Sequence, residues 1–215
     1  MLRAPRLSAA GPARPMAVPA PPGEAAPQPR PALRHDKLVL IGSSTGGVEA
    51  LLRLLGDYPA DCPPTAIVQH TGRGFGTSLC RLLDRNCAAE VVSAADGIAL
   101  HPGRVVLAAG CSHHFELTPG RALTGRFGGT DPIAGHCPSV DALFRSALPH
   151  AADTVAALLT GMGQDGAEGL LALRRAGALT LGQDETSSVV YGMPRAAFQI
   201  GAGCRQVAID ALAQE

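Results

Sequence analysis

A regular alternation of short apolar runs and helical patterns, from Lys37 to the C-terminus, constrains the fold of this chain more than any other feature. The runs predict strands at 38–42, 65–70, 90–94, 104–109, 154–160, 178–182 and 205–210. Helical patterns lie at 47–55, 76–85, 167–176 and from a Ser139 cap to about 148, and residues 114–127 predict a hairpin. Apolar strands that alternate with helices indicate a parallel sheet covered on both sides. We therefore predict an α/β fold: a doubly wound, mostly parallel sheet with helices on both faces and a small β-hairpin insertion.

The first 35 residues differ sharply in composition from the rest of the chain. Residues 1–34 hold half of the 18 prolines, five arginines and a single acid, Glu24. Such a segment cannot bury enough apolar surface to offset the entropy lost on ordering. We predict a disordered Pro/Ala/Arg-rich tail over 1–35 and one folded domain over 36–213.

The bulk composition excludes some classes of partner. The 18 Lys and Arg residues equal the 18 Asp and Glu residues in number, so no charge excess favours nucleic acid or a membrane surface. No apolar run approaches the ~18 residues of a membrane-spanning helix. The six cysteines form no CxxC pair, which favours reduced thiols and a cytoplasmic protein. They are Cys62, Cys80, Cys87, Cys111, Cys137 and Cys204.

The first predicted strand ends in an unusual turn, Gly42-Ser43-Ser44-Thr45-Gly46. This fits G-x-S-x-G, the pattern of a strand-to-helix elbow that exposes its central serine as a nucleophile, here Ser44. A Ser/Thr helix cap before a glycine-rich turn explains the same residues without chemistry. A phosphate-binding loop is disfavoured, because no lysine follows and neither glycine-rich phosphate pattern is present.

Two further strand ends carry complementary groups. His70 ends the strand 65–70 and could serve as a base for a serine, although a lone histidine is often structural. Asp165 follows the strand 154–160 and could orient that histidine, although Asp165-x-x-Glu168 also resembles a helix capping box. The carboxyl ends of parallel strands meet at one edge of the sheet, so the three side chains are expected to lie close together.

Six segments carry a resemblance to a known family: IGSSTGGVEALLRLL, IVQH, AADGIALHPGRVVLAAG, HCPSVDALFRS, LLTGMGQDGAEGLLALRRAGA and QDETSSVVYGMPRAA. Over roughly residues 38–202 the sequence resembles the catalytic domain of the chemotaxis protein-glutamate methylesterase (CheB) family. The resemblance implies a triad of Ser44 as nucleophile, His70 as base and Asp165 as orienting carboxylate. It also implies oxyanion support from the backbone N–H groups of Thr45 and Met162.

The resemblance further implies the substrate: γ-glutamyl methyl esters on chemoreceptors, hydrolysed to glutamate and methanol, with deamidation of receptor glutamines as a second reaction. It implies a chemoreceptor as partner, no cofactor and no metal. Cys111, His113, His114, His136 and Cys137 match no common zinc spacing, which agrees with that expectation.

Three departures from the family pattern keep a second hypothesis open. The family carries a receiver domain before the catalytic domain, whereas about 35 Pro/Ala-rich residues stand here, so we expect no phosphorylation control in cis and a separate receiver protein as a possible partner. Thr71-Gly72 replaces the usual methionine and proline after His70, and Cys137 replaces a common arginine. The alternative is a non-catalytic module that keeps the fold to bind a receptor or signalling partner.

Overall fold

The computed structural model describes residues 37–120, 122–203 and 205–215. Its centre is a seven-stranded sheet in the order β3-β4-β2-β1-β7-β8-β9, and all paired neighbours are parallel. The strands are β1 (Leu38–Ser43), β2 (Thr65–Gln69), β3 (Glu90–Ser93), β4 (Arg104–Ala109), β7 (Thr154–Leu158), β8 (Leu179–Gln183) and β9 (Arg205–Val207). The predicted parallel sheet is confirmed.

The remaining elements are a hairpin, five α-helices and two 3₁₀-helices among the described residues. The hairpin pairs β5 (Phe115–Leu117) with β6 (Gly125–Phe127) in antiparallel fashion. The helices are α1 (Gly47–Gly56), α2 (Gly76–Asp84), α3 (Val140–Ser146), α4 (Ala167–Arg175), α5 (Met193–Gln199), η1 (Leu148–Asp153) and η2 (Ile209–Gln214).

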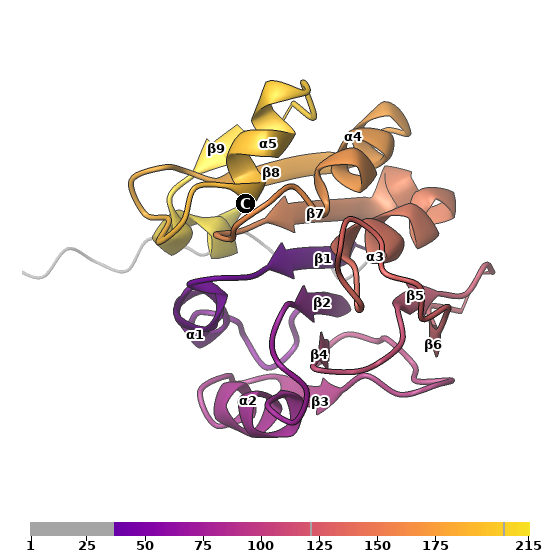
Figure 1. The fold of residues 1–215 in the computed structure, drawn as a ribbon. Helices are drawn as coiled ribbons and strands as arrows, with labels where there is room; N and C mark the ends of the chain where they lie inside the picture. The colour runs from indigo at the N-terminus through magenta and orange to yellow at the C-terminus, as the bar shows by residue number, and fades with distance from the viewer. Residues whose placement is uncertain (1–36, 121, 204) are drawn as a thin grey trace, which may run out of the picture. The chain divides into compact units, whose positions relative to one another are not determined.

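Helices cover both faces of the sheet, as Figure 1 shows. One core lies between the sheet and α1, α2 and η2, and a second lies between the sheet and α3, α4, α5 and the hairpin. Strand β1 serves both cores, because Leu38 and Leu40 point into the second while Ile41 points into the first. This alternation is the period of two that a strand imposes on its side chains. The doubly wound fold and its hairpin insertion are therefore confirmed.

The chain reverses its direction of travel across the sheet at β1. Strand β1 pairs with β2 on one side and with β7 on the other, with Ser43 opposite Gln69 and Gly42 opposite Leu158. Sites in doubly wound sheets form beyond the carboxyl ends of the strands that flank such a switch point. The three strand ends singled out in the sequence are the ends of β2, β1 and β7, which are neighbours.

The prediction of a disordered tail over residues 1–35 lies outside the described residues. Within the described part of the chain, no helix has both the length and the apolar character needed to cross a membrane.

Candidate active site

The two serines of the turn after β1 have different surroundings. Ser43 is fully buried, and its hydroxyl donates to Oε1 of the buried Gln69 side chain at 2.6 Å. Ser44 is partly exposed and lies past the end of the strand, before the turn at Thr45-Gly46. Gly46 has φ = 81°, a left-handed conformation that glycine adopts without strain, and it is the N-cap of α1. Ser44 thus stays partly exposed at this turn, whereas the hydroxyl of Ser43 is bonded into the core.

His70 and Asp165 meet across the carboxyl edge of the sheet. His70 follows β2 directly, and its Nε2 lies 2.8 Å from Oδ2 of Asp165, in the loop between β7 and α4. The His70 side chain is 8% exposed and the Asp165 side chain is fully buried. A shielded contact of this kind is stronger than the same contact in water. The expected proximity of these two residues is confirmed.

Four donors surround the Asp165 carboxylate. Besides His70, it accepts from the Ser139 hydroxyl at 2.7 Å and from the N–H groups of Val140 and Asp141 at 2.8 and 3.1 Å. Burial by itself would raise the pKa of Asp165, but these hydrogen bonds outweigh it and hold the pKa below its ordinary range. Asp165 is therefore a carboxylate at neutral pH, which suits a group that orients an imidazole.

The capping-box reading of Asp165 is wrong. The N-cap of α4 is Gly166, with no side-chain hydrogen bond to the helix. Asp165 instead binds the first N–H groups of a different helix, α3, where Ser139 is the N-cap and accepts from the Ala142 N–H at 3.3 Å. The carboxylate caps α3 and holds His70 at the same time, an arrangement that local sequence spacing could not reveal.

A buried amide ties the Ser44 turn to His70. Nε2 of Gln69 donates to the carbonyl oxygens of Ser44 and His70 at 2.9 and 2.7 Å, and the His70 N–H donates to the Ser43 carbonyl at 2.9 Å. Nδ1 of His70 is buried and has no hydrogen-bond partner among the described residues. With Nε2 on Asp165, Nδ1 is the ring nitrogen left for a proton transfer. Sequence reasoning missed Gln69, whose only signal was a polar residue next to His70 at the end of an apolar strand.

Thr160 holds the backbone beside the two predicted oxyanion donors. The Ser44 N–H donates to the Thr160 carbonyl at 3.0 Å, and the Thr160 hydroxyl donates to the Thr45 carbonyl at 2.9 Å. Within the described residues, the N–H groups of Thr45 and Met162 donate to no other protein group. The Met162 side chain is strongly exposed, at 72% for the residue. Both N–H groups thus remain available beside the Ser44 turn.

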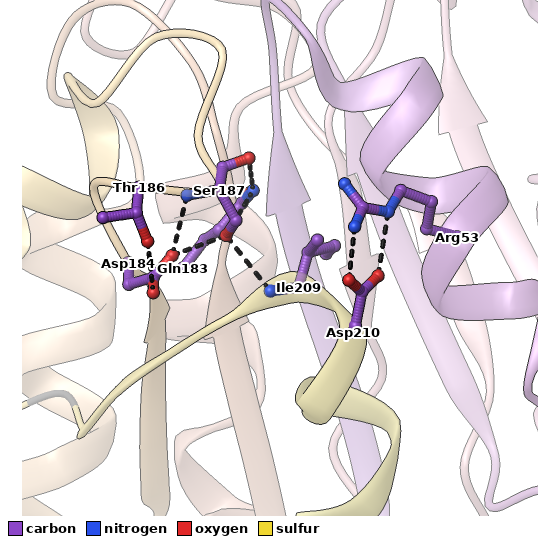
Figure 2. Close-up of polar contacts among 7 residues, drawn as sticks. All are labelled: Arg53, Gln183, Asp184, Thr186, Ser187, Ile209 and Asp210. Atoms are coloured by element: carbon purple, nitrogen blue, oxygen red, sulfur yellow. Dashed lines mark hydrogen bonds and ion pairs between the residues drawn. The ribbon is translucent and has the colours of Figure 1, made fainter.

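A second polar network lies beyond the end of β8, and Figure 2 shows the part of it that joins Gln183, Asp184, Ser187 and Ile209. Oε1 of Gln183 accepts from the Thr160 N–H at 2.8 Å, and its Nε2 donates to the Ser187 carbonyl at 2.7 Å. Asp184 Oδ1 accepts from the Ser187 N–H at 3.0 Å, and the Ser187 hydroxyl accepts from the Ile209 N–H at 3.1 Å. These bonds connect the loop after β8 to the end of β7.

This chain matches the family model for the CheB methylesterase over residues 39–215. It belongs to the CheB methylesterase family.

Similar proteins include two named protein-glutamate methylesterase/protein-glutamine glutaminase. The one from Caulobacter vibrioides is 50% identical over 196 residues, which cover 88% of this chain and 57% of that protein. The one from Agrobacterium fabrum is 47% identical over 89% of this chain and 56% of that protein. The chain thus spans a little over half the length of these curated relatives.

A solved structure agrees with the CheB-family fold. The crystal structure of the Thermotoga maritima CheB methylesterase catalytic domain is 31% identical and superposes with a TM-score of 0.78. The match covers 82% of this chain and 95% of that one.

The histidines weighed as metal ligands have other surroundings in this CheB-family chain. His114 is buried, with Nε2 2.8 Å from the Asp131 carbonyl and Nδ1 accepting from the Ser139 N–H at 3.1 Å. His136 lies against His70 with stacked rings. No group of three or more His, Cys, Asp or Glu residues in the described ranges could hold a metal ion. His136, considered in the sequence only as a ligand, is the second site residue that sequence reasoning missed.

Proposed function

We propose that this chain is a protein-glutamate methylesterase that hydrolyses γ-glutamyl methyl esters on chemoreceptors, and also deamidates receptor glutamines. The observation that carries the proposal is the buried His70–Asp165 pair, 2.8 Å apart, tied through Gln69 to the turn that exposes Ser44. Family membership and relatives named for both reactions support the choice of substrate.

In the first half-reaction the Ser44 hydroxyl attacks the ester carbonyl carbon while Nδ1 of His70 takes its proton. The negative charge on the tetrahedral carbonyl oxygen is stabilised by the Thr45 and Met162 N–H groups, and one such donor contributes about 10²–10³ in rate. The C–O bond to the methoxy group then breaks, and His70 returns the proton so that methanol leaves. A covalent glutamyl ester on Ser44 remains.

The second half-reaction repeats these steps with water. His70 takes a proton from water, the resulting hydroxide attacks the glutamyl ester on Ser44, and the proton passes to the departing Ser44 oxygen. Glutamate is the product. With a glutamine side chain as substrate, ammonia leaves in place of methanol. Throughout, the Asp165 carboxylate stabilises the His70 imidazolium, and its lowered pKa keeps it ionised at neutral pH.

We infer a cytoplasmic enzyme that works on the cytoplasmic part of a receptor. The described cysteines Cys62, Cys80, Cys87, Cys111 and Cys137 are all free thiols, as expected in a reducing compartment. A separate receiver protein as a partner of this chain stays a prediction.

Methanol release from methylated receptor membranes tests the proposal. Wild-type protein should release methanol, Ser44→Ala should reduce the rate by roughly 10⁴-fold or more, and the adjacent Ser43→Ala should retain most of it. Equal release by wild type and Ser44→Ala would overturn the proposal. The rival binding module predicts instead that neither protein turns over and that Ser44→Ala binds receptor membranes as well as wild type does.

A further inference from the structure

One face of the His70 ring is covered by a second imidazole. The ring centroids of His70 and His136 are 3.8 Å apart and the ring planes differ by 7°, which is a close, parallel stack. Asp165 engages the His70 ring at its edge, through Nε2, so the two contacts do not compete. The His70 imidazole is therefore fixed in one direction by the carboxylate and in another by the His136 ring.

The loop that carries His136 is held rigidly. Ile133 and His136 exchange two backbone hydrogen bonds of 3.0 and 2.9 Å, so the chain reverses through Ala134 and Gly135. Both turn residues have positive φ, 48° and 82°, as two-residue hairpin turns with primed geometry require.

The same loop is anchored at both ends by one buried side chain. His114 contacts the Asp131 carbonyl with Nε2 and accepts from the Ser139 N–H with Nδ1. Ser139 in turn donates to Asp165. The ring that stacks on His70 and the carboxylate that orients His70 are thus supported by one framework, as a preorganised site requires.

The charge state of His136 suits contact with a histidine that becomes positive during a reaction. Burial lowers the pKa of His136, repulsion from His70 lowers it further, and Asp165 partly opposes them. The net effect favours a neutral ring at neutral pH. A neutral aromatic face attracts a cation placed over it, whereas a second cation would repel it.

We propose that His136 is a positioning residue for the reaction, whose flat, uncharged ring holds the His70 imidazole in place and stabilises its imidazolium form. The inference rests on the proposed function, because it assigns His136 to the base of that triad. The proposal predicts that the reaction needs a flat aromatic ring at position 136. It does not need a ring that titrates or that forms hydrogen bonds.

The test compares His136→Phe with His136→Leu, two apolar side chains of which only the first has a flat ring. The readout is the second-order rate constant for labelling of Ser44 by a small fluorophosphonate, which requires an activated serine but no receptor. We expect His136→Leu to lower this rate constant about tenfold and His136→Phe to stay within about threefold of wild type. The matched control is His101→Leu, because His101 is an exposed histidine that precedes β4, at the opposite edge of the sheet. It should label at the wild-type rate.

Two outcomes would overturn the inference: His136→Leu labelling as fast as wild type, or His136→Leu and His136→Phe slowed equally. Equal slowing would mean that the imidazole acts through its nitrogens. Thermal melting of each variant checks that it is folded. Receptor kinetics on the same samples complete the test, because a positioning role predicts a fall in kcat with little change in KM. If wild-type Ser44 is not labelled at all, the proposed function itself fails, so the two failures are distinguishable.

Discussion

Ser43 and Ser44 are adjacent in the chain and lie in opposite surroundings. The buried Ser43 hydroxyl donates a hydrogen bond to Oε1 of Gln69. The amide nitrogen of Gln69 donates to the Ser44 and His70 carbonyl oxygens. Because a carbonyl oxygen only accepts and an amide nitrogen only donates, the orientation of the Gln69 side chain is fixed by its bonds to the Ser44 and His70 carbonyl oxygens, and the Ser43 hydroxyl then donates to Oε1. Ser43 is thus a support for the turn, while the Ser44 hydroxyl makes no such bond to Gln69 and is the nucleophile that we propose.

Replacing Ser43 by alanine separates support from chemistry. Ser43→Ala leaves the buried Oε1 of Gln69 without its donor, which costs about 1–3 kcal/mol. We expect urea unfolding to report a loss of that size, while fluorophosphonate still labels Ser44. Loss of labelling with unchanged stability would assign the nucleophile to Ser43 instead.

At the residue scale, the sequence predicted what local patterns encode and missed what tertiary contacts create. The G-x-S-x-G turn pointed to Ser44, and the strand ends pointed to His70 and Asp165. His136 reaches the site on a loop far from His70 in the chain, and Thr160, at the end of the predicted strand 154–160, donates its hydroxyl to a turn that is distant in the sequence. No local spacing signals a stacked ring or such a bond. Their roles depend on how loops meet, which requires the folded structure.

Among the elements, helices α3 and α4 approach closely at a glycine. A Cβ added at Gly169 of α4 would lie 2.8 Å from the Phe144 Cβ and 2.9 Å from Asp141 Oδ1. The Gly169 N–H also donates to that Asp141 oxygen, at 2.5 Å. Because Asp165 binds the first N–H groups of α3, this crossing also helps to fix the carboxylate that holds His70.

The variant Gly169→Ala tests this crossing. Overpacking costs about 1–3 kcal/mol, more than the gain of up to about 1 kcal/mol in helix propensity, so we expect a net destabilisation. Gly56→Ala is the matched control, because Gly56 ends α1 and an added Cβ there meets no atom within 4 Å. Chemical denaturation should give a lower free energy of unfolding for Gly169→Ala than for Gly56→Ala. Equal free energies of unfolding would contradict the close crossing of α3 and α4.

Element prediction succeeded where the hydrophobic pattern was strong. The seven sheet strands lie within a few residues of their predicted ranges, because the inner strands are apolar runs buried on both faces, whereas the edge strands β3 and β9 keep exposed polar residues. The strand predicted to reach 210 ends at Val207, since Ile209 donates to Ser187 and the chain turns into η2. The 3₁₀-helices and the seven-residue α5 were not predicted, because such short elements depend on packing more than on periodicity.

Across the whole molecule, stability should depend on pH in the acid range through Asp184. Hydrogen bonds from Ser187, opposed by slight burial and aided by Thr186, hold the pKa of Asp184 below its ordinary value. A carboxyl group with a depressed folded-state pKa stabilises the fold above its unfolded pKa of about 3.9, and this stability is lost as pH falls through the folded value.

The variant Asp184→Asn removes this titration while keeping an oxygen that can accept from Ser187. We expect the melting temperature of wild type to exceed that of Asp184→Asn at pH 6, and the difference to shrink as pH falls from about 4 to 2. Melting curves at several pH values in that range measure it. A difference that stays constant or widens on acidification would contradict the assignment.

The Asp165 carboxylate has a consequence for how the activity proposed here could be lost. The Asp165 carboxylate both caps the first N–H groups of helix α3 and orients His70. Replacing it would therefore reduce the stability of the fold as well as the reactivity of the site. Ser44 has no comparable structural role, because it is a partly exposed residue at a turn that other groups hold in place. A descendant that lost hydrolysis but kept the fold in order to bind a partner would therefore be expected to change first at Ser44. It would keep Asp165 long after the reaction was lost, because the fold still needs that carboxylate.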